Sequence, residues 1–166
     1  MSVAADRFSA AVAIVLEREG VLSDDRADPG GLTKFGIAAA SHPGVDIATL
    51  TRDQAIAIYR SDYWDTNCCG EMPWLVAMAV FDCAVNQGAG AAANILQQAV
   101  GVPVDGRIGD RTLVALAAQR PEELFATIMA LRAQRYVMTA GYPEYGKGWF
   151  RRLFLNTLAA AAAPTA

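Results

Sequence analysis

The chain has 166 residues, 54% of them hydrophobic, and carries a net charge of −3 with a pI near 5.1. This hydrophobic fraction can build one sizeable core and excludes a disordered chain, while the acidic balance argues against general binding of nucleic acid. No apolar run reaches the roughly 18 residues of a membrane-spanning helix, so stable membrane insertion is not expected.

The cysteines and the single histidine give no support to a metal site. Cys68 and Cys69 are adjacent, Cys83 stands alone, and His42 is the one histidine of the sequence. Because no CxxC pair occurs, a Cys/His zinc site lacks ligands, and we expect neither a metal nor another cofactor. Reduced thiols without a catalytic role are the expectation.

The first predicted helix is amphipathic and ends near a glutamate. Its apolar residues have the i, i+3, i+4, i+7, i+8 spacing of one buried face: Phe8, Ala11, Val12, Val15 and Leu16. The same spacing puts Glu19 on that face, and Gly20 is expected to end the helix. Burial and the negative end of the helix dipole both raise the pKa of a carboxyl group, which suits a general acid. The alternative is a glutamate that turns outward or pairs with Arg26.

A loop and a short strand follow this helix. "ADPGG" at 27–31 has the composition of a turn, and "LTKFGI" at 32–37 alternates as a strand does, so a small β-hairpin is predicted. Asp28 follows Glu19 by nine residues, and Thr33 comes five residues later. An acid, a carboxylate base and a hydroxyl that holds water are the groups that an inverting glycosidase needs. For Asp28 the alternative is an ordinary turn residue.

The rest of the chain is predicted to be helical. A helix over 50–64 has Thr51 as its N-cap and Gln54 three residues on, which is the pattern of a capping box. Residues 72–88 are apolar almost all round and predict a central helix, whose polar exceptions Asp82 and Asn86 share one face. Further helices are predicted at 88–101, after a cap at Asp110, from Pro121 to about 139, and over 149–158. A break at 141–149 and a frayed alanine tail at 159–166 complete the prediction, which is mainly α with one small β-hairpin.

Residues 19–37, "EGVLSDDRADPGGLTKFGI", resemble the pattern "EGGYVNDPADPGGATNFGI" of glycoside hydrolase family 108, the N-acetylmuramidases of phage lysis and of some bacterial secretion systems. The matched positions include Glu19, Asp28, Thr33 and Phe35. Val21 and Leu22 stand where the pattern has glycine and tyrosine, and Arg26 stands where it has proline. The spacing of the glutamate, aspartate and threonine is also similar to that of the catalytic set of phage-type lysozymes.

Four later segments are similar to the peptidoglycan-binding region that accompanies this family: "YW" at 63–64, "FDCAVNQG" at 81–88, "LQQAVGVPVDGRIGDRTL" at 96–113 and "GWFRRL" at 148–153. The resemblance implies a lysozyme-like helical fold and cleavage of the β-1,4 bond between N-acetylmuramic acid and N-acetylglucosamine. It also implies a catalytic region at 1–87 and a helical peptidoglycan-binding region at 88–166, packed into one compact unit. Glu19 would be the acid, with Asp28 and Thr33 placing the water.

Four residues are candidates for binding the sugar. Aromatic rings stack on the apolar faces of sugars, and acetamido groups need amide partners, which points to Phe35, Trp64, Asn86 and Gln87. Trp64 is as much a candidate for the core as for a groove. Asn86 could instead brace the hairpin loop. The aspartates of "VDGRIGD" are read as turn and cap residues rather than as glycan ligands.

The leading hypothesis is therefore a muramidase that inverts the anomeric centre and whose partner is the glycan strand of peptidoglycan. A lytic transglycosylase would need only the acid, and a catalytically silent binding module would need none of the three residues. We expect a monomer. Because the N-terminus lacks the basic start and cleavage site of a signal peptide, we expect synthesis in the cytoplasm and release to the cell wall or periplasm through a holin or a dedicated exporter.

Overall fold

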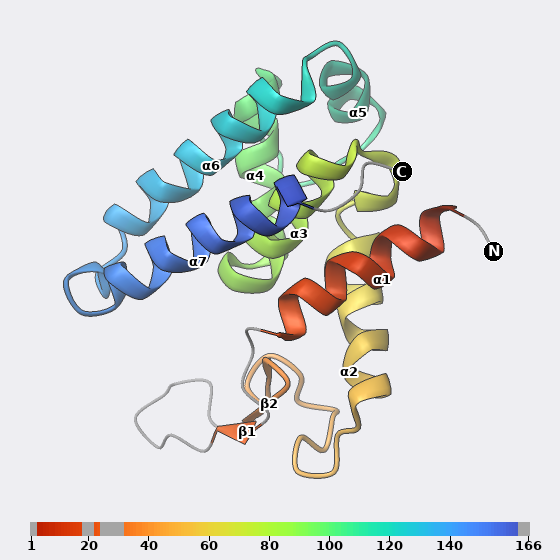
Figure 1. The fold of residues 1–166 in the computed structure, drawn as a ribbon, viewed down its shortest axis with the longest axis vertical. Coiled ribbons are helices and arrows are strands. Elements are labelled where there is room, and N and C mark those ends of the chain that lie inside the picture. The colour runs from red at the N-terminus through yellow and green to blue at the C-terminus, as the bar shows by residue number, and fades with distance from the viewer. Residues whose placement is uncertain (1–2, 18–21, 24–31, 163–166) are drawn as a thin grey trace.

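The computed structural model describes residues 3–17, 22–23 and 32–162 of the chain (Figure 1). Within these ranges the fold is mainly α with one small antiparallel sheet, as predicted. α6 (Pro121–Val137) and α7 (Tyr142–Ala162) run side by side, α1 (Val3–Leu16) crosses the middle of the molecule beside the central helix, and the sheet lies at the lower end of the view. None of the helices in the described ranges has the length and hydropathy needed to cross a bilayer.

α1 is held by the apolar face that its sequence predicts. Phe8, Ala11, Val12 and Val15 are all buried, whereas Ser9 and Ala10 between them are exposed. The Phe8 ring packs edge-on against Phe81, whose ring centroid lies 6.2 Å away. α1 is therefore held against the central helix, α3 (Trp74–Gln87).

The sheet consists of β1 (Leu22–Ser23), β2 (Thr33–Lys34) and β3 (Ile37–Ala38), in that order and antiparallel. Its tight hairpin turns at Phe35 and Gly36, which both have positive φ values of 52° and 77°. Such a φ favours glycine, so the turn at Phe35 is strained and needs support. The buried Tyr59 supplies it, because its hydroxyl donates to the carbonyl oxygen of Phe35 at 2.9 Å.

The helix predicted over 50–64 divides into two parts. α2 (Arg52–Ile58) begins at the predicted capping box, in which the Gln54 amide N–H donates to Thr51 Oγ1 and the Thr51 amide N–H donates to Gln54 Oε1. The chain continues as the π-helical segment η1 (Tyr59–Asp65) and reaches α3 through the short 3-10 turn η2 (Cys69–Glu71). The wider winding of η1 directs both Tyr59 and Trp64 into the core.

α3 is the central helix, and it is surrounded by α4 (Ala89–Val100), α6 and α7. Its residues 76–84 are all buried, which confirms the prediction of a helix covered on every side. α3 also contacts α1, so it joins the N-terminal elements to the C-terminal ones. The division of the chain near residue 88, where α3 ends and α4 begins, stays a prediction.

Two predicted helix starts are wrong. The sequence predicts Asp110 as the N-cap of α5 (Asp110–Ala117), but Asp110 is the first helical residue. The N-cap is Gly109, which has no side chain to form a capping hydrogen bond. The expected break at 141–149 is instead the first part of α7. Gly146 sits there against Tyr142, so close that a Cβ would lie 2.5 Å from the Tyr142 Cδ2. This ring packing outweighs the low helix propensity of glycine, which costs roughly 1 kcal/mol.

The alanine tail is also more ordered than predicted, as far as it is described. α7 extends to Ala162, and Ala160 is buried. The indole N–H of Trp74 donates to the carbonyl oxygen of Ala160 at 2.9 Å. This bond joins the last turns of α7 to the first turn of α3.

Candidate active site

A cleft lies where the ends of α1 and α3 meet one side of α7. Its volume is about 630 Å³, and its walls are formed by Glu17, Asn86, Gly148, Trp149, Arg151, Arg152 and Leu155. Glu17 directly follows α1, and Asn86 is in the last turn of α3. Both helices therefore direct the negative end of their dipoles toward this region, opposite the two arginines of α7. The walls can offer an amide, an indole ring, a carboxylate and two guanidinium groups to a ligand.

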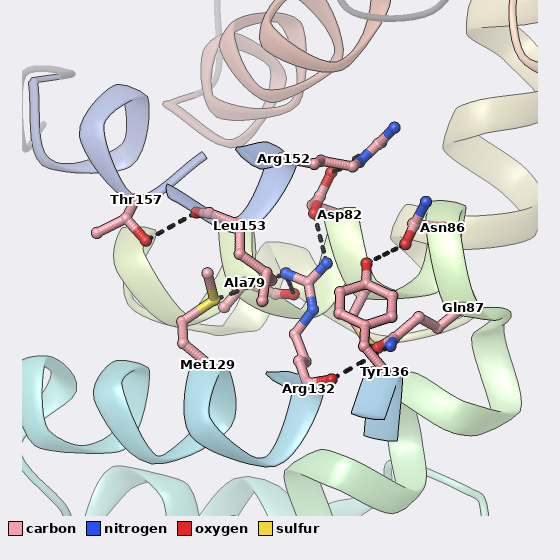
Figure 2. A network of polar contacts seen from close by, with 11 residues as sticks. Ala79, Asp82, Asn86, Gln87, Met129, Arg132, Tyr136, Arg152, Leu153 and Thr157 are labelled. Atoms are coloured by element: carbon pink, nitrogen blue, oxygen red, sulfur yellow. Dashed lines mark hydrogen bonds and ion pairs between the residues drawn. The ribbon is translucent and has the colours of Figure 1, made fainter. Parts of the chain in front are cut away.

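A buried ionic centre supports the arginine wall of the cleft (Figure 2). Arg132 Nη2 donates to Asp82 Oδ2 at 2.5 Å, and Arg152 donates through Nε and Nη2 to Asp82 Oδ1 at 3.0 and 2.9 Å. The side chain of Asp82 is 1% exposed and that of Arg132 is fully buried, whereas Arg152 is 16% exposed. Arg152 thus extends from this centre to the cleft.

The charges of this centre are tightly coupled. Burial alone would raise the pKa of Asp82, but the guanidinium groups of Arg132 and Arg152 outweigh it and hold that pKa below its usual range. Burial would likewise lower the pKa of Arg132, and the Asp82 carboxylate raises it instead. The centre is consequently charged at neutral pH and joins α3, α6 and α7 by ion pairs rather than by apolar packing alone.

A second group of side chains joins α6 to the cleft. The Tyr136 hydroxyl donates to Asn86 Oδ1, and the Tyr136 ring stacks on Trp149 with centroids 5.1 Å apart and an interplanar angle of 24°. Burial raises the pKa of Tyr136, so its hydroxyl stays protonated and remains a donor at neutral pH. Asn86 is therefore oriented by Tyr136, and Trp149 is fixed as a half-buried ring at the cleft wall.

A smaller hollow of about 230 Å³ adjoins the cleft and shares Asn86 and Trp149 with it. Its other walls come from Gln87, Arg135, Tyr136 and Thr139. The polar surface thus continues from the end of α1 along the end of α3 toward α6. A surface of this length can hold an extended ligand rather than a single small molecule.

Of the three residues predicted to be catalytic, Glu19 and Asp28 lie outside the residues that the structure describes. Thr33 lies in β2, half-buried, where it is paired with Ser23 of β1 and Ala38 of β3. The threonine therefore sits on a strand with neighbours on both sides. Glu19 lies in the sequence between Glu17 at the cleft and β1, which pairs with this strand.

The candidate binding residues have different environments. Phe35 is half-buried at the hairpin turn, where Lys34 Nζ lies 5.7 Å from the centre of its ring. Trp64 is only 2% exposed and packs edge-on against Phe8 and Phe81, at centroid distances of 5.6 and 5.4 Å. A ring so enclosed has no face for a sugar, so the groove role predicted for Trp64 is corrected to a core role.

Asn86 and Gln87 lie at the cleft and at the adjoining hollow, respectively. Asn86 is exposed and accepts a hydrogen bond from the hydroxyl of Tyr136 in α6. Its partner is therefore a helix residue and not the hairpin loop that the sequence offered as an alternative. Gln87 accepts from the Cys83 thiol at 3.2 Å and donates to the carbonyl oxygen of Arg132 at 3.5 Å. Burial raises the pKa of Cys83 to about 11, so this thiol stays protonated as a donor.

Sequence reasoning missed Trp149 and Tyr136 as parts of the site. Trp149 lies in "GWFRRL", a segment whose similarity to the peptidoglycan-binding region assigns no role to its tryptophan. Tyr136 gave no signal, because its partner Asn86 is 50 residues earlier in the chain. In the described part of the chain, His, Cys, Asp and Glu side chains form no group of three that could hold a metal ion.

Known proteins resemble both parts of the chain. The model of the glycosyl hydrolase 108 family matches residues 12–88, and a model described as a predicted peptidoglycan domain matches residues 91–154. The solved structure of SagA from Brucella abortus is 30% identical in sequence and covers 95% of each chain with a TM-score of 0.87. A search among curated proteins gave no significant match.

Taken with the fold and the cleft, these matches define a lysozyme-like helical glycoside hydrolase that acts on peptidoglycan. The chain belongs to glycosyl hydrolase family 108. The resemblance found in residues 19–37 and the peptidoglycan partner are thereby confirmed.

Proposed function

We propose that the chain is an N-acetylmuramidase that hydrolyses the β-1,4 bond between N-acetylmuramic acid and N-acetylglucosamine with inversion. The observation that carries the proposal is the cleft beside the end of α1, which is lined by Glu17, two residues before Glu19 in the sequence. Its amide and indole walls suit N-acetylated sugars, because amides pair with acetamido groups and aromatic rings contact apolar sugar faces.

The arginines of the cleft also support a glycan that carries carboxylates. N-acetylmuramic acid carries a lactyl group, on which peptidoglycan bears peptide stems with carboxylates. Arg151 is exposed at the cleft, and Arg152 is held at its wall by Asp82. A guanidinium group pairs well with a carboxylate because its planar donors match the two oxygens. Glu17 and the negative ends of two helix dipoles lie opposite, so it is a pair between exposed Arg151 and a stem carboxylate that would favour peptidoglycan over an uncharged polysaccharide of N-acetylglucosamine.

In this mechanism Glu19 donates a proton to the leaving oxygen, while Asp28 accepts a proton from a water on the opposite face of the sugar. Thr33 holds that water by a hydrogen bond from the strand β2. Support for Thr33 comes from the rigidity of its hairpin, whose turn is fixed by the hydrogen bond from Tyr59 to Phe35. A carboxylate that attacked the sugar directly would need no hydroxyl to place water.

The testing experiment replaces the acid and identifies the product. Glu19→Gln should reduce the turnover of purified cell walls by on the order of 10²–10⁴-fold, because it removes the proton and preserves the shape of the side chain. Glu122→Gln, at an exposed position in the first turn of α6, is the matched control and should turn over normally. Activity of Glu19→Gln within about tenfold of the wild type would move the acid to another residue.

The product separates the rival functions. NMR of the first product from a defined glycan should show a reducing N-acetylmuramic acid released as the α-anomer. A β-anomer would mean retention, and a 1,6-anhydro sugar in mass spectrometry would mean a lytic transglycosylase. A wild-type protein that binds cell walls and releases no sugar would be a binding module.

We also propose that the protein acts as a monomer and reaches the wall only when a holin or a dedicated exporter opens the route. Light scattering of the purified protein tests the first point, and a dimer would refute it. Fractionation of producing cells tests the second. Periplasmic protein with a processed N-terminus would contradict the proposed route.

A further inference from the structure

A third hollow, of about 460 Å³, is lined by residues of α4 and α6 and of the turn that follows α6. We propose that it is a remote glycan subsite, which binds an N-acetylated sugar of the strand several units away from the bond that is cut. The inference rests on the proposed function and specifies how that function selects its substrate.

The hollow continues the line of the other two. It shares Arg135 and Thr139 with the hollow beside Tyr136, which in turn shares Asn86 and Trp149 with the cleft. The three depressions therefore form a row: the cleft at the end of α1, the hollow beside Tyr136, and the hollow between α4 and α6. A linear polymer fits such a path, whereas a small compact ligand would use one depression only.

Amide side chains dominate the polar part of this hollow. Asn94 and Gln98 lie four residues apart on one face of α4, and Gln134 lies on α6 across from them. All three are exposed, and none makes a side-chain hydrogen bond to another residue in the described part of the chain. Each can therefore donate and accept at once, which is what acetamido and hydroxyl groups of a sugar require.

The apolar part of the hollow completes the match. Ile95 and Leu131 form its floor, and Met138 at its edge is 79% exposed. An aliphatic and thioether surface contacts the C–H face of a pyranose ring without demanding a charge. No carboxylate is among the residues that line it, and Arg135 is its one charged residue. A neutral amino sugar, or one that carries an acid group, fits this lining better than a cation does.

The experiment compares long and short substrates. The test variant is Asn94→Ala combined with Gln98→Ala, and the control is Gln119→Ala, an exposed amide after the end of α5. The long substrate is glycan strands from which an amidase has removed the peptide stems. The short substrate is the tetrasaccharide of two disaccharide repeats, which on this proposal occupies the cleft and leaves the hollow on α4 empty.

We expect the double variant to raise KM for long strands roughly five- to tenfold, the loss of one or two hydrogen bonds, with kcat unchanged. Turnover of the tetrasaccharide should stay at the wild-type level, and Gln119→Ala should match the wild type on both substrates. Equal KM values on long strands for the double variant and the wild type would overturn the subsite. Equal losses on long and short substrates would overturn it as well, because they would indicate general damage.

A direct titration keeps this result separate from the proposed function. Long stem-free strands are added to the Glu19→Gln variant while the side-chain amide signals of Asn94, Gln98 and Gln134 are followed by NMR. Shifts of these signals support the subsite, and their absence at saturating strand concentration refutes it. If the wild type cleaves neither substrate, the muramidase proposal fails, and the titration still decides whether the hollow binds glycan.

Discussion

The molecule contains two polar centres that are built in opposite ways. The centre at Asp82 joins residues 50 and 70 positions apart in the chain and is made of full charges. The centre at the buried Gln97 joins residues only 8 to 15 positions apart and is made mainly of amide and backbone groups. One fixes how helices pack, and the other fixes the shape of one loop.

The Gln97 centre closes the "VDGRIGD" loop. Gln97 Nε2 donates to Asp105 Oδ1 at 2.7 Å and to the carbonyl oxygen of Arg107 at 2.8 Å, while Oε1 accepts from the amides of Asp105 and Gly106. The hydrogen bond from Gln97 is the first cause that lowers the pKa of Asp105. Asp105 is thus engaged in holding the loop, as expected of a turn residue.

Asp82→Asn should have the largest effect and sharpens the contrast. It leaves the buried guanidinium of Arg132 without its counter-charge, so we expect a loss of about 3–5 kcal/mol in the free energy of unfolding. Urea denaturation measures it. The control is Glu123→Gln, which breaks the exposed pair with Arg120 and should cost about 0–1 kcal/mol. Equal losses of unfolding free energy in the two variants would contradict the larger contribution that we assign to the Asp82 centre.

Gln97→Leu should have the next largest effect. The change replaces the amide by an apolar side chain of similar size and leaves the backbone N–H groups of Asp105 and Gly106 without their acceptor. This should lower the free energy of unfolding by about 1–3 kcal/mol. Gln98→Ala, on the exposed side of the same helix, should change stability by about 0.5 kcal/mol or less. A neutral Gln97→Leu would mean that water replaces the lost bonds and that the loop needs no brace.

The two centres should also differ in their response to acid. Because the folded pKa of Asp82 is depressed, its contribution is fully present above the unfolded pKa of about 3.9 and is lost as pH falls through the lower folded value. Unfolding midpoints in urea between pH 5 and pH 2 should therefore fall less steeply in Asp82→Asn than in the wild type. Gln97→Leu should also flatten the slope, because it removes the hydrogen bond that lowers the pKa of Asp105, but the effect should be smaller than in Asp82→Asn since Asp105 is exposed to solvent. Parallel curves for Asp82→Asn and the wild type would refute this linkage.

Tyr136→Phe should have the smallest effect on stability, about 1 kcal/mol, because it removes one hydrogen bond and preserves the stack on Trp149. It should also release Asn86 at the cleft, so that KM for peptidoglycan rises more than kcat falls. A change in kcat alone would show that Asn86 does not contact the substrate before the chemical step.

What could be predicted from the sequence is mostly local. The capping box of Thr51 and Gln54 involves residues three apart, and the apolar face of α1 repeats within four residues, so both could be recognised directly. The start of α7 could not, because the packing of Tyr142 on Gly146 is invisible in helix propensities.

Pairs that are distant in sequence escaped prediction for the same reason. Asp82 was singled out as a polar exception on an apolar helix, yet nothing local indicated Arg132 and Arg152 as its partners. Trp64 could serve a groove or the core equally well until its neighbours were known. The Glu19, Asp28 and Thr33 set came from spacing and resemblance, and its catalytic roles stay predictions.

The three tryptophans differ in a way that makes the protein its own optical probe. Trp64 is enclosed in the core, and the indole N–H of Trp74 donates a hydrogen bond to the carbonyl oxygen of Ala160. Trp149, by contrast, is half-buried at the cleft. A ligand that enters the cleft can change the emission of Trp149 while the other two indoles contribute a constant background. Undocking of the last turns of α7 would instead alter the emission of Trp74. Unlabelled protein can thus report ligand binding and helix undocking through separate fluorophores.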